Sequence, residues 1–327
     1  MSSVFVTGAT GLTGANVCKI LIERGDHVRA LARPAADTEA LSAMGVELVD
    51  GDVTDADSVL RAARGCESAI HCAALLGGAS QDVADFQAVN VDGTRHVLDA
   101  AAALGMRRTV ALSTGTFFDT TGDVELEEAP IAAQPSTDPY TVTKLAAFRE
   151  ATARAAAGQD VVTCHPGAIF GPSPVLSRAL HRTSFNNVLL AALRKRFDSY
   201  LRFPITWVFA DDVARGAVAA LDRGVSGERY MLDGRPQDVM SVAACSNRCL
   251  AVAGISHRIE DVEPSWDPAL VERFGPTLVA IATAERGDPR LRSTDTKTSR
   301  RLGYVPTPLD DGLRALVDWL RLHGKVS

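Results

Sequence analysis

The sequence predicts an α/β protein with a doubly wound parallel sheet and a smaller C-terminal domain, and three observations support this fold class. The chain begins with a β-branched and aromatic run, a glycine-rich turn and an apolar-periodic helix. Strand-like and helix-like segments then alternate through the first half of the chain, as in a parallel sheet covered by helices. The 327 residues are 46% hydrophobic, which is enough to bury one large core or a large and a small one.

The first unit of this alternation is the stretch Val4 to Gly14. Gly8, Gly11 and Gly14 follow one another at three-residue steps between the strand and the helix. Glycines let the backbone bend sharply and approach a diphosphate, and the positive end of the helix dipole favours the anion. An ordinary glycine turn is the alternative, but the order of strand, turn and helix favours nucleotide binding.

The second predicted strand, His27 to Ala32, ends at Arg33. An acidic side chain at the end of this strand would accept hydrogen bonds from an adenosine ribose, whereas an arginine can pair with a 2′-phosphate. Arg33 therefore favours NADP(H) as the cofactor, with NAD(H) possible. A solvated surface charge is the alternative explanation of Arg33.

The third and fourth predicted strands, Val46 to Val49 and Ser68 to Ala74, end in residues that suit a cofactor site. Asp52 follows the third strand, where it either reaches the adenine edge or forms a turn or helix cap. Ala73 and Ala74 are small, which suits a strand end where a cofactor passes over the sheet.

The next helix and strand bring polar residues to the same edge of the sheet. The helix is predicted over Asp85 to Ala103 and carries Asn90, which we expect to hydrogen-bond a neighbouring strand because a buried amide is costly without a partner. The fifth strand, Arg108 to Leu112, delivers Ser113 and Thr114 to the edge where the earlier strands end.

Tyr140 and Lys144 lie four residues apart in a predicted helix, and therefore on one helical face. A phenol keeps its proton up to about pH 10, and a nearby ammonium stabilises the phenolate, which makes the group usable in acid/base chemistry. Such a pair is usually a surface contact. The strand-end hydroxyls and the glycine turn in the same chain favour a catalytic site instead.

Together these motifs resemble the extended short-chain dehydrogenase/reductases, the group of NAD(P)-dependent epimerases, dehydratases and dihydroflavonol-reductase-like enzymes. The resemblance is strong over residues 3–235 and loose beyond. It implies a Rossmann-type sheet domain over residues 1–165 with a return segment near 204–232, and a discontinuous substrate domain over 166–203 and 233–327. Further matching motifs are Gly51-Asp52-Val53, His71-Cys72-Ala73-Ala74, Asn90 to Thr94, Pro166-Gly167, Gly171-Pro172 and Phe209 to Asp212.

The resemblance also implies roles for individual residues. Tyr140 is the expected general acid/base, and Lys144 is expected to lower its pKa and hold the nicotinamide ribose. Thr114 matches the catalytic serine or threonine, with Ser113 as the adjacent candidate, and Pro166-Gly167 turns the chain under the nicotinamide ring. The expected cofactor-binding residues are Gly8, Thr10, Gly11, Leu12, Arg33, Asp52, Val53, Ala73, Ala74, Tyr140, Lys144, Pro166 and Gly167.

Two departures from the family pattern bear on the substrate. Phe118 and Asp119 stand where sugar-nucleotide epimerases usually have Tyr-Gly, and His165 stands where an arginine is frequent. The first departure argues against a sugar nucleotide as the substrate. The basic residues 194–196 could contact a nucleoside diphosphate and so support such a substrate. A solvated helix end is the alternative explanation of these cations. The candidate substrate contacts, with core packing as the alternative for the aromatic residues, are Phe117, Phe118, Phe170 and Asn187.

The sequence therefore predicts an NADP(H)-dependent oxidoreductase that transfers a hydride between nicotinamide and a small ketone, aldehyde or alcohol. The alternative is a sugar-nucleotide epimerase or dehydratase with a retained NAD(P). A non-catalytic NADP(H) sensor is a third hypothesis, but a sensor has no need of the Tyr140–Lys144 pair.

Composition limits the partners and the location. A net charge of -6 argues against a nucleic-acid surface, and no signal layout or apolar run of membrane-spanning length is present, so we expect a cytoplasmic protein without a membrane partner. The six cysteines are read as reduced thiols; Cys245 and Cys249 have no histidine at ligand spacing, so no metal is expected. His71, inside an apolar strand, is expected to be packed rather than catalytic. A homodimer through the helices of Asn90 and Tyr140 is expected from the resemblance.

Overall fold

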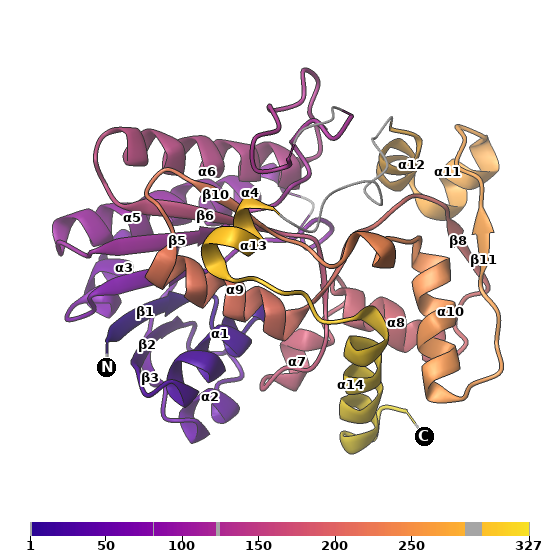
Figure 1. Ribbon diagram of the computed structural model, residues 1–327, viewed down its shortest axis with the longest axis horizontal. Helices are drawn as coiled ribbons and strands as arrows, with labels where there is room; N and C mark the ends of the chain where they lie inside the picture. Colours follow the sequence, from indigo (N-terminus) through magenta and orange to yellow (C-terminus); the bar gives the residue numbers. More distant parts are fainter. Residues whose placement is uncertain (1, 81, 122–124, 285–295, 327) are drawn as a thin grey trace.

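The computed structural model describes residues 2–80, 82–121, 125–284 and 296–326 (Figure 1). Within these residues, the main sheet has seven strands, all parallel, in the order β10-β6-β5-β4-β1-β2-β3. The predicted doubly wound parallel sheet is confirmed. The strand order reverses beside β1, between β2 and β4, which is where ligands bind in such sheets. The strands are β1 Ser3–Thr7, β2 His27–Ala32, β3 Glu47–Asp50, β4 Ser68–His71, β5 Arg108–Leu112, β6 Val161–Pro166 and β10 Arg229–Leu232.

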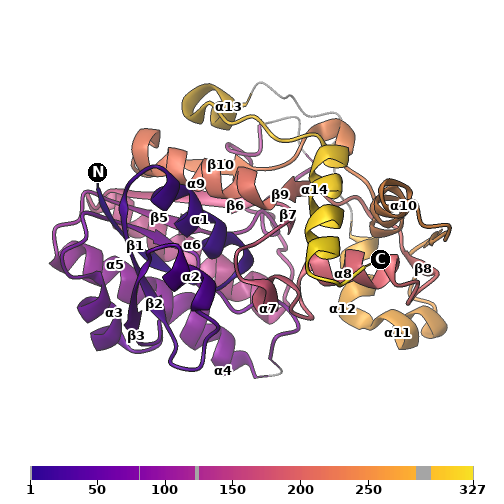
Figure 2. The ribbon, with the colours of Figure 1, turned by 90° about the horizontal axis from the view of Figure 1, so that it is seen from below.

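Helices cover both faces of this sheet, as the views of Figures 1 and 2 show. On one face α1, α2 and α9 pack against the strands, and on the other α3, α5 and α6. Both faces are buried, which is why the strands read as apolar runs in the sequence. The helices are α1 Leu12–Glu23, α2 Glu39–Ala43, α3 Ala56–Ala63, α5 Gly93–Ala103, α6 Pro139–Ala156 and α9 Ala210–Arg223.

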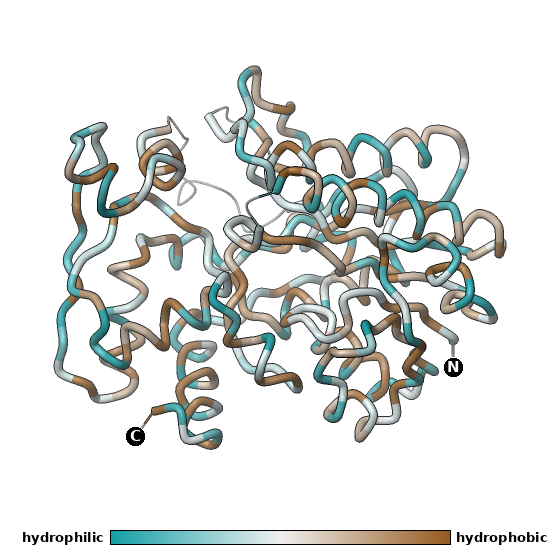
Figure 3. Tube along the Cα trace, turned by 180° about the vertical axis from the view of Figure 1, so that it is seen from behind, coloured by the Kyte–Doolittle hydropathy of each residue, from teal (hydrophilic) through white to brown (hydrophobic). Residues whose placement is uncertain are grey.

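A second hydrophobic cluster lies in the C-terminal half and is built from segments that are far apart in the chain. Trp207, Leu250 and Leu316 are among its buried residues. In Figure 3 hydrophobic and hydrophilic residues alternate along α14, as expected for a helix with one buried face. The domain boundaries drawn from the sequence remain a prediction. The elements are α7 Leu176–Ala179, α8 Phe185–Leu193, β8 Ser199–Leu201, α10 Val242–Ala253, β11 Glu260–Val262, α11 Pro268–Phe274, α12 Pro276–Thr283 and α14 Leu309–Leu322.

Three shorter elements connect the two halves. The strands β7, Ala168–Phe170, and β9, Trp207–Phe209, pair in parallel where the chain leaves the sheet and returns to it. The helix α13, Lys297–Leu302, comes back from the C-terminal half and packs on α9 and β10. Residues of both halves therefore surround the end of β10.

Three predicted elements differ in the structure. The fourth strand ends at His71 rather than Ala74, and the chain continues as a loop. The helix predicted over 85–103 is α4, Val83–Phe86, followed by a π-helix at Gln87–Asp92 and then α5. The sequence also predicts one helix over Asp267 to Ile281, but in the structure this segment is broken into α11 and α12 by Gly275, which has a φ of +82°, and by the proline after it.

Within the described ranges, no helix is both long enough and apolar enough to span a bilayer.

Candidate active site

The glycine turn joins β1 to α1 and packs tightly against the neighbouring strand end. Gly8 has a φ of +67°, and its carbonyl accepts a 2.9 Å hydrogen bond from the Gly11 amide. A Cβ on Gly8 would lie 2.6 Å from the Ala73 nitrogen, and one on Gly14 would lie 2.2 Å from the Gly8 oxygen. Both positions therefore require glycine for the close approach of backbone to backbone.

The N-terminus of α1 is open to an anion. Among the described residues, no side chain caps the helix at Gly11, and its first turn has no acidic residue. The free amide N–H groups and the helix dipole both favour a negative charge at this end. The turn thus fits the diphosphate of a dinucleotide.

Substituting Gly14 with alanine should destabilise the protein before any ligand is considered. The new methyl group would meet the Gly8 carbonyl at 2.2 Å, and overpacking of this kind typically costs about 1–3 kcal/mol. Gly11→Ala is the matched control, since its Cβ would lie 3.2 Å from the same oxygen. Urea unfolding of the two variants measures the difference; equal stabilities would show that the turn relaxes easily.

Arg33 and Asp52, the two charged residues at the predicted adenosine end of the site, have different surroundings. Arg33 is exposed directly after β2. The Asp52 carboxylate accepts hydrogen bonds from the amide and the hydroxyl of Thr54, both at 3.0 Å, which is the turn geometry considered as its alternative. Val53 is buried in the cluster under α3 and α5. Contacts of Asp52 and Val53 with the cofactor remain predictions.

Tyr140 lies in the first turn of α6, which begins after Asp138. The Asp138 carboxylate caps the helix by accepting a 3.0 Å hydrogen bond from the Thr141 amide, and Pro139 occupies the first helical position. Burial raises the pKa of the Tyr140 phenol, and a hydrogen bond with the Thr114 hydroxyl acts in the opposite direction. The phenol therefore keeps its proton at neutral pH and can donate it.

Lys144 lies one turn further along α6 and is buried, with 4% of its surface exposed. Its ammonium donates a 2.6 Å hydrogen bond to the carbonyl of Leu112 at the end of β5. Burial lowers the pKa of Lys144 to about 8. In this structure the Lys144 ammonium is held by Leu112, and the lowering of the Tyr140 pKa by Lys144 remains a prediction.

The two hydroxyls after β5 have different surroundings. Thr114 is buried at 5% exposure and faces the phenol of Tyr140. The Ser113 hydroxyl is shielded from solvent and has no hydrogen-bond partner among the described residues. A buried hydroxyl without a hydrogen-bond partner costs free energy of folding. Ser113 therefore marks a place where a ligand can supply the missing partner. The strand end thus fits a bound polar group.

The strand β6 ends next to these hydroxyls at Pro166. Gly167 follows, and a Cβ there would lie 2.4 Å from the backbone oxygen of Thr206, so the chain requires glycine at this crossing. The loop after β4, which holds the partly exposed Ala73 and Ala74, also borders the site: Gly77 lies near the Cβ of Tyr140. The predicted strand-end residues are therefore brought to one edge of the sheet.

His165, on β6, holds the strand end that carries Thr114. It is fully buried, and its Nδ1 lies 2.7 Å from the Thr114 carbonyl while its Nε2 lies 3.0 Å from the Thr163 hydroxyl. Burial lowers the pKa of His165 to about 3, so the ring is neutral. Because a carbonyl only accepts, Nδ1 carries the proton and donates to Thr114. The sequence marked this position only as a departure from the family.

A second buried histidine, His71, lies in a chain of hydrogen bonds that reaches from β1 to α6. Its Nδ1 is 2.7 Å from the Thr7 hydroxyl and its Nε2 is 3.0 Å from the Thr94 hydroxyl. Thr94 donates to the backbone oxygen of Asn90, and the Asn90 amide donates to Thr143 on α6. His71 is packed, as predicted.

Asn90 does not bind a strand, contrary to expectation. Its side chain exchanges two hydrogen bonds with the backbone of Leu75, at 2.7 and 3.1 Å, in the loop after β4. The π-helix places its amide between that loop and Thr143 of α6. π-turns often occur at functional sites, and this one fixes the first turn of the helix that carries Tyr140.

The aromatic candidates for substrate contact belong to the interior. Phe117 and Phe118 are buried and pack with Phe148 around the ring of His165. Phe170 is equally buried in the C-terminal cluster. We therefore correct the expectation: these side chains offer no surface to a substrate, and core packing, the alternative considered for them, describes their place.

Asn187, the remaining substrate candidate, lies on α8. It lines a cavity of about 300 Å³ in the C-terminal half together with Phe197, Tyr200, Arg273 and others. Contact of Asn187 with a substrate remains a prediction.

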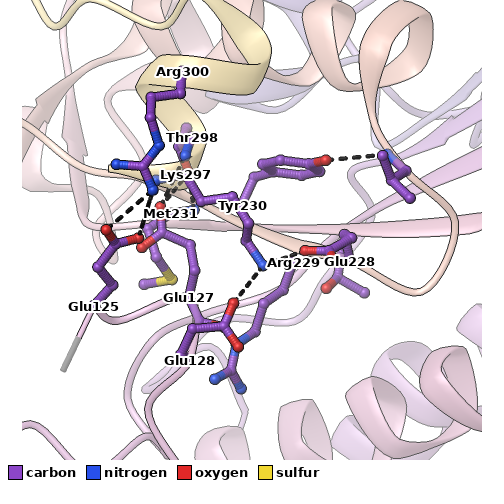
Figure 4. A network of polar contacts seen from close by, with 12 residues as sticks. Glu125, Glu127, Glu128, Glu228, Arg229, Tyr230, Met231, Lys297, Thr298 and Arg300 are labelled. Atoms are coloured by element: carbon purple, nitrogen blue, oxygen red, sulfur yellow. Dashed lines mark hydrogen bonds and ion pairs between the residues drawn. The ribbon is translucent and has the colours of Figure 1, made fainter. Parts of the chain in front are cut away.

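A polar network that the sequence did not reveal holds the loop after β5 (Figure 4). The buried Glu127 carboxylate accepts hydrogen bonds from the amide and hydroxyl of Thr298 on α13, at 3.1 and 2.6 Å. Arg229 on β10 donates to the carbonyls of Glu127 and Ala129, and its guanidinium lies 4.2 Å from the ring centre of Phe118. Glu127 and Ala129, in the segment that follows Thr114, are thus held by residues about 100 and 170 positions away.

The two buried histidines should make the stability of the protein depend on pH in the acid range. Burial lowers the pKa of His71 and of His165 to about 3, against about 6.5 in an unfolded chain. Between these values the unfolded chain binds more protons, so the free energy of unfolding falls as the pH falls through this range. We expect each histidine to contribute about 2 kcal/mol to the loss between pH 7 and pH 5.

Urea unfolding of His165→Gln at pH 7 and pH 5 tests this expectation. The variant should lose about 2 kcal/mol less than the wild type over this interval. His323→Gln, at an exposed histidine, is the control and should behave as the wild type. An unchanged pH dependence in His165→Gln would contradict a neutral, buried His165.

The fold and the edge of the sheet just described are those of dinucleotide-binding enzymes. A model described as the NAD dependent epimerase/dehydratase family matches residues 4–232, and the chain belongs to that family. The chain is thus an NAD(P)-dependent enzyme of the extended short-chain dehydrogenase/reductase type.

Individual relatives cover nearly the whole chain. The chain is 29% identical over 339 residues to sterol demethylase protein B of Methylococcus capsulatus, covering 99% of this chain and 100% of the relative. It is 27% identical over 318 residues to 4-hydroxy-2-methyl-3-oxo-4-farnesyl-3,4-dihydroquinoline-1-oxide ketoreductase of Stigmatella aurantiaca, covering 92% and 91% of the two chains. The crystal structure of gox2253 superposes with a TM-score of 0.85 at 26% identity over 100% of both chains.

Proposed function

We propose that this protein is an NADP(H)-dependent reductase of a small ketone or aldehyde, working reversibly as an alcohol dehydrogenase. The observation that carries the proposal is the partly buried, protonated phenol of Tyr140, which faces the hydroxyl of Thr114, with the ammonium of Lys144 one helical turn further along α6. A carbonyl oxygen that gains charge during reduction needs a proton donor and a second hydrogen bond, and these two side chains provide both.

The family binds a nicotinamide cofactor, and the residues present fit one. The uncapped start of α1 would hold the diphosphate, and the orphaned hydroxyl of Ser113 lies at the strand end assigned to the nicotinamide half. When bound, such a cofactor supplies or accepts the hydride. In this proposal the chain itself binds and orients the reactants and moves the proton.

The proton path is short. Tyr140 donates its phenolic proton to the substrate oxygen, and Thr114 donates a hydrogen bond to the same oxygen. Lys144 keeps a positive charge near the phenolate that results, which favours proton release from Tyr140 in the reaction even though burial opposes it at rest. His165 acts through Thr114, since it fixes the Thr114 carbonyl.

A reductase is preferred to an epimerase for two reasons. A relative that aligns with over nine-tenths of the chain is named as a ketoreductase. The position where sugar-nucleotide epimerases usually have a tyrosine holds Phe118, which is buried beneath Arg229. The epimerase or dehydratase is the second candidate, because the matched family includes both activities by its description.

Oxidation of NADPH, followed at 340 nm against panels of aldehydes, ketones and sugar nucleotides, tests the proposal. We expect turnover with a carbonyl compound and a preference for NADPH over NADH. A protein that retains cofactor through purification and converts a UDP-sugar without net oxidation would overturn the reductase in favour of the epimerase. Equal use of NADH would overturn the cofactor preference alone.

A further inference from the structure

We infer that Arg178, from the C-terminal half of the chain, joins Arg33 to form the binding site for the 2′-phosphate of NADP(H). The inference rests on the proposed function, whose cofactor preference it explains. It adds a residue that lies 145 positions beyond Arg33 in the sequence and outside every motif considered above.

The segment that carries Arg178 is anchored on the nucleotide-binding half. The Ser177 hydroxyl donates a 2.6 Å hydrogen bond to the Asp37 carboxylate, in the loop that follows β2. Asn16 on α1 donates a 3.0 Å hydrogen bond to the carbonyl of Pro172, and Val175 is buried in the cluster beneath α1 and α9. Figures 1 and 2 both show α7 beside the helices of this half. Arg178 is thus held beside the end of β2.

The charges at this place are unbalanced. Burial lowers the pKa of Arg178, and the neighbouring charge of Arg33 lowers it further, so the two guanidiniums lie within electrostatic reach of each other. In the described part of the chain, neither has a hydrogen-bond or ion-pair partner, although many arginines do, such as Arg24 and Arg108. Two solvent-accessible guanidiniums within electrostatic reach of each other, with no ion-pair partner among the described residues, can bind an anion that has several oxygens.

The position selects the 2′-phosphate among possible anions. In parallel sheets of this type the adenosine ribose lies at the end of the second strand, and Arg33 follows that strand directly. The diphosphate has its own site at the start of α1. Asp37, the acid in the same loop, accepts a hydrogen bond from Ser177 and keeps its charge, so the two guanidiniums still leave a net positive charge at this place. A phosphate on the ribose would therefore meet one guanidinium from each half of the chain.

Isothermal titration of the full chain with adenosine 2′,5′-bisphosphate and with ADP tests the inference without any turnover. We expect Arg178→Ala to weaken binding of the bisphosphate about 10-fold or more and to leave ADP within about 2-fold, since only the first ligand has a 2′-phosphate. Arg33→Ala should do the same. Arg178→Lys should recover part of the loss, because a lysine keeps the charge but not the forked donors.

Arg182→Ala is the matched control from the same segment. Its guanidinium donates to the Gly78 carbonyl, so this variant should keep the wild-type ratio of the two affinities. Arg178 is exposed, and thermal unfolding of each variant checks that the fold is kept. An Arg178→Ala protein with the wild-type ratio, or one that loses both ligands equally, would overturn the inference.

The outcomes separate this inference from the proposed function. If the wild type prefers the bisphosphate and only Arg33→Ala removes the preference, the inference fails and NADP(H) stands. If the wild type binds both ligands equally, the inference and the cofactor preference fail together, while carbonyl reduction remains testable with NADH.

Discussion

Replacing Tyr140 with phenylalanine lowers kcat by about 10²–10⁴-fold, the range typical of losing a general acid. The variant removes one oxygen from a partly buried side chain and leaves α6 and its Asp138 cap in place. Thr114 keeps its hydroxyl, but its pKa is far too high to replace a phenol as the proton donor. Cofactor affinity should change little, because the diphosphate and adenosine ends of the site are untouched. Stopped-flow turnover and titration with NADPH measure the two quantities separately.

Tyr304→Phe is the matched control for this substitution. Tyr304 is also a partly buried tyrosine, and its hydroxyl donates a 3.0 Å hydrogen bond to the backbone oxygen of Asp233. This variant should lose about 1 kcal/mol of stability and keep its kcat. Near-normal turnover in Tyr140→Phe would remove the basis of the proposed chemistry.

Replacing Lys144 with methionine should separate activity from stability. We expect kcat/KM to fall by about 10²-fold or more, because the phenolate of Tyr140 loses the positive charge behind it and the end of β5 loses its hydrogen bond at Leu112. The free energy of unfolding at pH 7 should change much less than the activity does. Burying a charged lysine is itself costly, as the lowering of its pKa to about 8 shows, and methionine fills similar volume without a charge.

The pH dependence of unfolding gives a second readout for Lys144. Its pKa is about 8 in the folded protein and about 10.4 in an unfolded chain. Between these values the unfolded chain binds more protons, so the wild type should gain up to about 3 kcal/mol as the pH rises through this range. The methionine variant should lack this gain. Lys19→Met, which removes a 3.5 Å surface ion pair with Asp211, should retain it.

The strands and the spacing of the site residues were predictable because local chemistry determines them. The second and fifth strands, His27–Ala32 and Arg108–Leu112, have the predicted bounds, since strands buried on both faces are continuous apolar runs. A parallel sheet brings their ends to one edge, so Thr114 lies near Tyr140 although the two are 26 residues apart.

The parts that could not be predicted depend on contacts between distant segments. Nothing near Glu127 in the sequence shows that its carboxylate binds Thr298 on α13. Phe118 lies beside the catalytic motif, and only the packing of Arg229 over its ring shows that it faces inward. The same holds for Arg178, whose neighbour at the end of β2 is revealed only by the docking of α7.

The π-helix at Gln87–Asp92 takes up one extra residue within a continuous helical segment. A π-turn holds one residue more than an α-turn, so the turns on either side of it keep their helical phase. Deleting a single residue within Gln87–Asp92 should therefore let a regular α-helix form while Phe86, Val97 and Leu98 still face the interior. The bulge that places the Asn90 amide between Leu75 and Thr143 would be lost instead. The extra residue thus serves the contacts of Asn90 rather than the packing of the helix.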